Sequence, residues 1–184
     1  NTEIFDDAAI GSDRVADIVV KAIKDHEKAA LPRPFKLGLT TGRTPISLYS
    51  NLTRQFKEGK VSFANVEVFS IDEYYPCGSD SIQSRNHRLH DEFLDQVDVR
   101  KENIHIPDGS VSKEEISDYC AEFDRIARGI DLLVIGVGEG GQVGFNDAAT
   151  TEKSVTRTVP LSYISRKRQA HNFNGDIAVT PKAA

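Results

Sequence analysis

Two adjacent carboxylates are the first groups in this chain that could carry out chemistry. Asp72 and Glu73 follow directly on the apolar, β-rich run 66–71. If that run is a strand, successive side chains point to opposite sides, so that one carboxylate faces a ligand and the other the scaffold. A carboxylate with a suitable pKa can move a proton between neighbouring carbons of a bound sugar. A turn or helix-cap aspartate is the structural alternative for Asp72.

A turn with small hydroxyl side chains is the second candidate, and its chemistry is anion binding. The turn spans residues 40–45, and its candidate ligands are Thr41, Gly42, Arg43 and Thr44. Backbone N–H groups at a helix N-terminus attract anions, so phosphate is the expected ligand. The turn lacks the GxxxxGK[ST] pattern of nucleotide P-loops. An ordinary connection between a strand and a helix is the alternative.

A glycine-rich loop at residues 136–147 is the third candidate. Five glycines fall within residues 136–144. Such a loop allows the backbone to approach a ligand closely, with Gly138 and Gly141 as candidate contacts. Its spacing, and the lack of a following helix, argue against a dinucleotide-binding fingerprint.

Other polar groups give weaker signals. His87 and His90 lie three residues apart on a polar helix face, which is more often solvated than a metal site. The basic cluster 166–168 is most simply a solvated face, although it could meet an anion. Candidate anion contacts are Arg157, Arg166, Arg168 and His171. We expect no metal ion and no organic cofactor, because proton transfer by side chains needs neither.

The elements that must position these groups alternate between strand and helix. Predicted strands cover residues 35–40, 66–71, 104–106 and 131–136. Helical patterns between them imply right-handed βαβ units. The expected fold class is therefore α/β, with a doubly wound, mostly parallel sheet and helices on both faces. Ligands bind beyond the carboxyl ends of strands in such sheets, so the three loops are expected to meet at one site.

Helix starts can be predicted from capping residues. Ser12 and Asp13 precede an apolar helical stripe, and Thr44 is placed as the N-cap of a helix with Pro45 at its first position. A capping box of Ser112 and Glu115 precedes a further helix.

Composition excludes several function classes. The net charge is −5 and the pI is about 5.6, so the basic excess that is typical of nucleic-acid binding is absent. No apolar run approaches the ~20 residues that cross a bilayer, and the first residues do not resemble a signal peptide. Cys77 and Cys120 cannot build a disulfide framework, which favours a reducing, cytoplasmic setting.

Domain organisation is expected to be simple. We predict a single domain over residues 1–184, since no internal repeat or linker divides the chain. The sequence contains no methionine, which indicates a processed or trimmed part of a longer gene product.

Taken together, the motifs resemble the glucosamine-6-phosphate deaminases, also called glucosamine-6-phosphate isomerases. The likeness includes residues 37–45 (LGLTTGRTP), 69–74 (FSIDEY) and 102–109 (ENIHIPDG). Residues 136–147 are similar to the catalytic loop of that family, which reads GxGxDGHIxFNE. The resemblance implies a Rossmann-like fold of the sugar-phosphate isomerase type. It also implies that this chain stops where the family continues with a further C-terminal part.

The resemblance also implies residue roles. The phosphate of an amino sugar phosphate would lie on the first loop, and Asp72 would move a proton between C2 and C1 while ammonia leaves. The aspartate, histidine and glutamate of the family's loop correspond here to Gly140, Gln142 and Asp147. Gln142 can hydrogen-bond a sugar oxygen but has no proton to exchange near neutral pH. The implied catalytic set is therefore Asp72, Asp147 and Gln142, and the family's phosphate-binding arginine falls near His171, with Arg166 or Arg168 as substitutes.

Three functions stay open at this point. The first is an enzyme of carbohydrate metabolism that isomerises and deaminates an amino sugar phosphate. The second is a non-catalytic sugar-phosphate-binding or sensor module, which Gly140 and Gln142 favour. The third is a 6-phosphogluconolactonase-like hydrolase, which the loop ending at 145–147 disfavours. The expected partner is a small-molecule sugar phosphate, with no nucleic acid and no membrane, and assembly into a homo-oligomer is left open.

Overall fold

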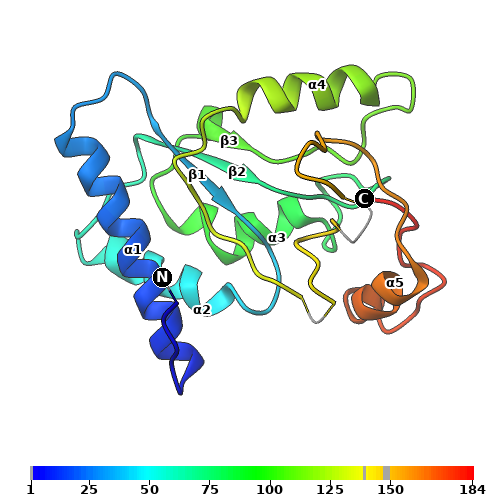
Figure 1. The fold of residues 1–184 in the computed structure, drawn as a ribbon, viewed down its shortest axis with the longest axis horizontal. Coiled ribbons are helices and arrows are strands. Elements are labelled where there is room, and N and C mark those ends of the chain that lie inside the picture. Colours follow the sequence, from blue (N-terminus) through cyan, green and yellow to red (C-terminus); the bar gives the residue numbers. More distant parts are fainter. Residues whose placement is uncertain (1, 139, 147–149) are drawn as a thin grey trace. The chain divides into compact units, whose positions relative to one another are not determined.

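The computed structural model describes residues 2–138, 140–146 and 150–184. The chain divides into two compact units. The first unit comprises Asn1–Phe69, Leu89–His105 and Ile130–Val134, and the second unit comprises Ser70–Arg88, Ile106–Gly129 and Ile135–Ala184. The sequence order of helices and strands can be followed in Figure 1.

The sheet has four strands in the order β3-β2-β1-β4. Its strands are β1 (Phe35–Leu39), β2 (Val66–Ser70), β3 (Ile104–His105) and β4 (Leu132–Leu133). β1 pairs in parallel with β4, where Leu37 lies beside Leu132, and β2 pairs in parallel with β3, where Val68 lies beside Ile104. A parallel sheet that grows from β1 first in one direction and then in the other is doubly wound. The predicted α/β fold class is confirmed.

The last strand is shorter than the run 131–136 predicts. β4 covers only Leu132–Leu133, although the amide of Val134 still donates to the carbonyl oxygen of Gly38. A Cβ at Gly38 would lie 2.4 Å from Cδ1 of Leu133, so a larger residue there would require the Leu133 side chain to move. The glycines that follow Val134 have low strand propensity, which explains the early end.

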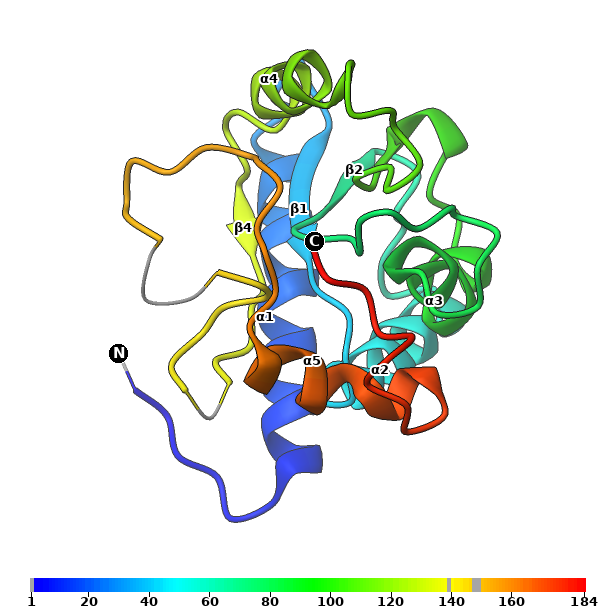
Figure 2. The same ribbon diagram turned by 90° about the vertical axis from the view of Figure 1, so that its right-hand side faces the viewer.

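Two long helices complete the core of the first unit. The helices α1 (Ala8–Lys28) and α2 (Ile46–Lys57) pack against each other, and Figure 2 shows α1 running behind β1 and β4. Val19 and Ile23 of α1 and Leu52 of α2 are fully or almost fully buried. Each such side chain contributes about 1.5–3 kcal/mol through burial. This packing fixes the strands whose carboxyl ends carry the candidate loops.

Three predicted helix starts are wrong. α1 begins earlier than Ser12 and Asp13 imply, because the carboxylate of Asp7 accepts a hydrogen bond from the amide of Ala9 and caps the helix there. α2 begins after Pro45, which is itself the N-cap, and no side chain caps this helix. The ring of Pro45 already holds φ at −77°, so the helical path begins without a capping bond from Thr44.

The predicted capping box does not form either. The hydroxyl of Ser112 donates to the Glu115 carboxylate at 2.6 Å, and α4 (Ile116–Ile126) begins only after Glu115. The two side chains therefore satisfy each other instead of the backbone amides.

The second unit is built from short helices and irregular segments. It contains α4, α5 (Tyr163–Gln169), the 3₁₀ turn η3 (Ala170–Phe173) and the first residues of α3 (Arg85–Glu92). Short 3₁₀ turns η1 (Leu94–Gln96) and η2 (Lys101–Asn103) belong to the first unit. Within the second unit, Tyr75 pairs antiparallel with Ala183 and Cys77 with Gly109. These pairings hold the segment that follows β2.

Candidate active site

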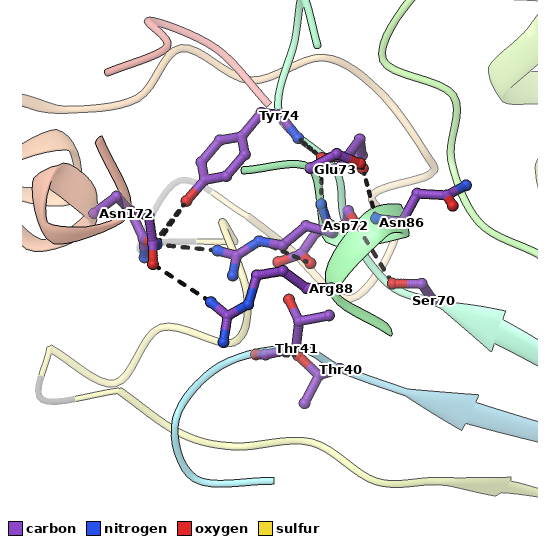
Figure 3. Close-up of polar contacts among 12 residues, drawn as sticks. Thr40, Thr41, Ser70, Asp72, Glu73, Tyr74, Asn86, Arg88 and Asn172 are labelled. Carbon is purple, nitrogen blue, oxygen red and sulfur yellow. Dashed lines mark hydrogen bonds and ion pairs between the residues drawn. The ribbon is translucent and has the colours of Figure 1, made fainter. Parts of the chain in front are cut away.

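Glu73 belongs to the scaffold. It is buried and accepts four hydrogen bonds, from the amide of Tyr74 at 2.7 Å, the hydroxyl of Ser84 at 2.6 Å, and the amides of Arg85 and Asn86 at 2.9 Å each (Figure 3). The last two donors are at the N-terminus of α3, where free N–H groups and the helix dipole favour a negative charge. Glu73 therefore caps α3, as expected for the carboxylate that faces the scaffold.

Asp72 has the opposite environment. Its side chain is only 10% exposed, and its Oδ1 atom is buried without a hydrogen-bond partner among the described residues. Burial raises the pKa of Asp72 above its ordinary value, the positive charge of Arg85 lowers it, and the negative charge of Glu73 raises it. A carboxyl group with a raised pKa can accept a proton and return it near neutral pH. Asp72 is thus suited to acid–base chemistry.

Arg85 is the positive group beside Asp72. Its Nε lies 4.0 Å from Oδ1 of Asp72, and the centre of its guanidinium lies 4.8 Å from the ring centroid of Tyr74 and 5.2 Å from that of Phe145. Its Nη2 donates to Oε1 of Gln169 at 3.2 Å. The guanidinium is therefore held by two aromatic rings and one amide oxygen, at a fixed place near the carboxylate.

A hydrogen-bond network from α5 and η3 supports this arrangement. The hydroxyl of Tyr74 donates to Oε1 of Gln169 at 2.8 Å, and Nδ2 of Asn172 donates to the Tyr74 hydroxyl at 3.3 Å. Nη1 of Arg88 donates to Oδ1 of Asn172 at 3.4 Å. In Figure 3 the side chains of Tyr74 and Arg88 both point toward Asn172. Burial raises the pKa of Tyr74, so its hydroxyl stays protonated and remains a donor.

The glycine-rich loop folds into a short hairpin. Val137 pairs antiparallel with Val143, and the amide of Gly138 donates to the carbonyl oxygen of Gln142 at 2.8 Å. The side chain of Gln142 turns back onto this hairpin, where its Oε1 accepts from the amide of Gly140 at 3.0 Å. The same side chain fills the space that a Cβ at Gly138 would need. Gln142 thus stabilises its own loop, and a role in catalysis stays a prediction.

The loop meets Asp72 at Gly144. Gly144 has φ of +57°, and a Cβ at this position would lie 2.7 Å from Oδ2 of Asp72. The next side chain, Phe145, contacts the ring of Tyr74 with 5.2 Å between centroids. Two of the three predicted loops are therefore confirmed to come together, both within the second unit.

The turn after β1 belongs to the first unit. The hydroxyl of Thr41 is buried and has no hydrogen-bond partner among the described residues, and Gly42 has φ of +139°. Arg43 and Thr44 are exposed. A buried hydroxyl without a partner beside the N-terminus of α2 agrees with an anion-binding turn, and phosphate binding there stays a prediction.

The four candidate anion contacts differ in exposure and in the hydrogen bonds that their side chains make. Arg166 donates to the carbonyl oxygens of Ile177 and Thr180, so its guanidinium stabilises the fold. Arg168 is exposed, and its Nη1 lies 3.5 Å from where a Cβ at Gly140 would be. His171 is exposed, and its ring bonds to the carbonyl oxygen of Arg168. Arg168 is therefore the basic side chain of this group that lies beside the glycine-rich loop.

Arg157 lies at a cavity. Together with Asp72, Tyr119 and Asn146 it lines a space of about 90 Å³ within the second unit. Its Nη2 donates to the hydroxyl of Thr150 at 2.9 Å. The predicted catalytic residue Asp147 lies outside the described residues, and no group of three or more potential metal ligands occurs among those that are described.

Several site residues were not identified from the sequence: Tyr74, Arg85, Gly144, Gln169 and Asn172. Tyr74 adjoins the two carboxylates, which is a usable signal. Arg85 lies at the start of a helix, after a polar loop, and nothing in the sequence indicates which side chains its guanidinium contacts. Gln169 and Asn172 come from a region that contacts Tyr74 only after folding.

Comparison with known proteins identifies relatives of the whole chain. Residues 6–161 match the sequence model of the family described as glucosamine-6-phosphate isomerases/6-phosphogluconolactonase. A glucosamine-6-phosphate deaminase of Tolumonas auensis is 40% identical over 83% of this chain and 58% of its own length. A glucosamine-6-phosphate isomerase of Candida albicans is 33% identical over 98% of this chain and 71% of its own length.

Solved structures agree with the sequence relatives. A monomeric glucosamine-6-phosphate deaminase superposes with a TM-score of 0.86 at 28% identity, over 96% of this chain and 71% of that protein. The 6-phosphogluconolactonase of Thermotoga maritima shares the fold with a TM-score of 0.62 at 23% identity, over 82% of this chain and 69% of that protein. This chain spans little more than half of the length of the Tolumonas relative.

A helix that crosses a bilayer must be long and apolar. Among the described residues, no helix is long and apolar enough to do so.

Proposed function

Since this chain belongs to the family of glucosamine-6-phosphate isomerases and 6-phosphogluconolactonases, we propose that it converts glucosamine 6-phosphate into fructose 6-phosphate and ammonia. The observation that carries the proposal is the state of Asp72. It is a buried carboxylate with a raised pKa, at the carboxyl end of a central strand, and one of its oxygens has no hydrogen-bond partner within residues 2–138, 140–146 and 150–184. By name, the relative from Tolumonas auensis is a deaminase of this substrate and the relative from Candida albicans is an isomerase of it.

The proposed chemistry needs one group that shuttles a proton. Ionised Asp72 takes the proton from C2 of the open-chain aldose, the C–H electron pair forms a double bond between C1 and C2, and the oxygen on C1 takes a proton from solvent water, which becomes hydroxide. Asp72 then returns its proton to C1, the nitrogen lone pair forms the C2=N bond, and the nitrogen gives one N–H proton to that hydroxide, which leaves an imine at C2. Water hydrolyses the imine to the ketose and ammonia. A raised pKa favours both directions of transfer.

Other residues would bind and orient the sugar. In the first unit, the amides of the 41–44 turn, at the N-terminus of α2, would bind a phosphate group. Arg168, beside the glycine-rich loop, would supply a further positive charge. Gly138 and Gly141 would allow close approach of the backbone, and Gln142 and Asp147 would contact the sugar oxygens.

Ammonia release tests this proposal directly. The protein is incubated with glucosamine 6-phosphate, and both ammonia and fructose 6-phosphate are measured for the wild type and for Asp72→Asn. The proposal requires both products in equal amounts from the wild type. A wild-type rate no higher than that of Asp72→Asn would remove the enzyme assignment.

One observation favours a second candidate, a sugar-phosphate-binding module without turnover. The side chain of Gln142 carries no charge and is engaged within its own loop, so the loop offers no proton donor among its described residues. Calorimetry that shows binding of glucosamine 6-phosphate without product would select this function. A lactonase function has weaker support, because the similarity to the lactonase of Thermotoga maritima, at 23% identity, establishes only the fold.

A further inference from the structure

Two buried charged groups in the second unit lack hydrogen bonds that they could make. Oδ1 of Asp72 and Nε of Arg85 are both buried and without a partner among the described residues, and they lie 4.0 Å apart. A hydrogen bond between N–H and oxygen spans about 2.7–3.2 Å, so this pair does not form one directly. Unsatisfied buried polar atoms are rare in native proteins and call for an explanation.

The gap is held open from both sides. The guanidinium of Arg85 lies over the rings of Tyr74 and Phe145, and Nη2 is bonded to Gln169. The amide of Arg85 is bonded to the Glu73 carboxylate, which anchors the first turn of α3. Closing the pair would therefore require Arg85 to give up contacts that it already has.

Asp72 is restrained on its other side. A Cβ at Gly144 would lie only 2.7 Å from Oδ2, so the backbone of the glycine-rich loop runs close against the carboxylate. The separation of Oδ1 and Nε is thus set by the packing around both side chains.

We propose that Asp72 and Arg85 hold one oxygen atom of the substrate between them, and that Arg85 is a further catalytic residue of this site. An oxygen about 2.8 Å from each atom fits a separation of this size. While Asp72 is ionised, a sugar hydroxyl suits the gap because it donates to the carboxylate and accepts from Nε–H at the same time. Once Asp72 is protonated, a carbonyl oxygen that gains negative charge suits the same gap, because it accepts from both groups. The identity of the ligand as a sugar phosphate rests on the proposed function.

The same geometry suits the step in which a proton moves. The proton passes from the substrate carbon to Asp72, and the C–H electron pair enters a double bond, so negative charge grows on the neighbouring oxygen. Protonated Asp72 is then a donor, and Nε–H of Arg85 donates as well. Arg85 keeps its own proton, since guanidinium groups do not deprotonate in proteins. Preorganised donors at such an oxygen stabilise the developing charge.

Kinetics of Arg85 variants test the inference. Arg85→Gln is expected to lower kcat/KM by about 10²–10³-fold, as for the loss of one oxyanion donor. Arg85→Lys keeps the charge but loses the planar donor, so its loss should lie between those of the wild type and Arg85→Gln. The control is Arg125→Gln, an exposed arginine of α4 paired with Glu122, which should match the wild type. Equal kcat/KM for Arg85→Gln and the wild type would overturn the assignment.

The pH profile separates this role from a structural one. Among the charged or titratable groups near Asp72, Arg85 lowers its pKa, Glu73 raises it, and the Tyr74 phenol interacts with it. The cavity that Asp72 lines is also lined by Tyr75, Asp108, Tyr119, Cys120 and Arg157, which are the same in every variant compared. Removing the positive charge of Arg85 therefore raises the pKa of Asp72 further, and the acid limb of kcat/KM moves to higher pH. Arg85→Lys and Arg125→Gln should leave that limb in place. An unmoved limb in Arg85→Gln would show that the charge of Arg85 does not act on Asp72 and would overturn its assignment.

A crystal structure distinguishes failure of this inference from failure of the proposed function. Wild-type crystals soaked with fructose 6-phosphate should show a ligand oxygen within about 3 Å of both Oδ1 and Nε. That result supports the inference even if the wild type releases no ammonia. A bound sugar elsewhere, an unoccupied gap, or a direct bond between Asp72 and Arg85 would overturn it, whatever the turnover.

Discussion

The segment that follows β2 and the glycine-rich loop both contribute to the candidate site, and they do so in different ways. In the first, Glu73 accepts four hydrogen bonds, while Oδ1 of its neighbour Asp72 accepts none from the part of the chain that the structure describes. In the loop, the polar side chain of Gln142 is satisfied by its own backbone, and Gly144 presents only main chain to Asp72. Among the described residues, the charged groups of this site therefore come from the first segment, and the residues of the loop contribute backbone packed against Asp72.

Residues with complete hydrogen bonds and residues with incomplete ones are expected to differ in what their substitution changes, the stability of the fold or the rate of catalysis. A side chain whose bonds are complete contributes to folding, and its loss is measured in the free energy of unfolding. A buried group with incomplete bonds contributes little to stability and is available to a ligand. Single substitutions can test both expectations, the one for stability and the one for activity.

The largest effect is expected for Asp72→Asn. Asparagine keeps the shape but cannot take a proton, so kcat should fall by about 10²–10⁴-fold. The free energy of unfolding should stay equal or rise, because a buried charge without a hydrogen bond is removed from Oδ1. Ammonia release and urea denaturation measure the two quantities. A clear loss of stability in this variant would show that Asp72, like Glu73, stabilises the fold.

Gly144→Ala should have the next largest effect. The methyl group would collide with Oδ2 of Asp72 and displace the carboxylate, and a shift of about 1 Å can cost 10²-fold in rate. Gly175→Ala is the matched control, since Gly175 has φ of +79° and no atom within 4 Å of its Cβ position. Both variants carry similar backbone strain, so equal activities would show that contact with Asp72 does not matter.

Glu73→Gln should mainly reduce stability. The amide that replaces one oxygen faces donors at the N-terminus of α3, so the free energy of unfolding should fall by about 1–3 kcal/mol. Thermal or urea unfolding measures the loss. Glu122→Gln on the surface of α4 is the control and should unfold like the wild type. If Glu73→Gln were as stable as Asp72→Asn, the contrast between the two carboxylates would be wrong.

The smallest effect is expected for Gln142→Ala. Its recorded side-chain bond stays within the loop, and one hydrogen bond contributes about 0.5–1.5 kcal/mol. The rate of ammonia release should therefore fall by less than about tenfold. A loss as large as that of Asp72→Asn would mean that this side chain acts on the substrate, and the loop would then supply more than backbone.

Much of the fold could be predicted from local patterns. Strands at 35–39 and 66–70 have dense runs of apolar and β-branched residues, and alternation with helices predicts a parallel sheet. Helix starts were less predictable, because Asp7 and Ser12 are both good caps and tertiary context selects between them.

The site could be predicted only in part. Asp72 was identifiable because polar residues at the carboxyl end of a parallel strand face the ligand side. Arg85 was not, since its neighbours Phe145 and Gln169 are distant in the sequence and no periodic pattern connects them. Gly144 is one of several glycines in its loop, and only its φ and its closeness to Asp72 distinguish it.

The separation of Asp72 and Arg85 has a consequence for the protein in the cell. A ligand that completes both bonds binds the folded chain and not the unfolded one, so it raises the melting temperature by mass action. At a concentration 100 times its dissociation constant, such a ligand adds about 2.7 kcal/mol of stability. The abundance of this protein would then rise and fall with the supply of that ligand.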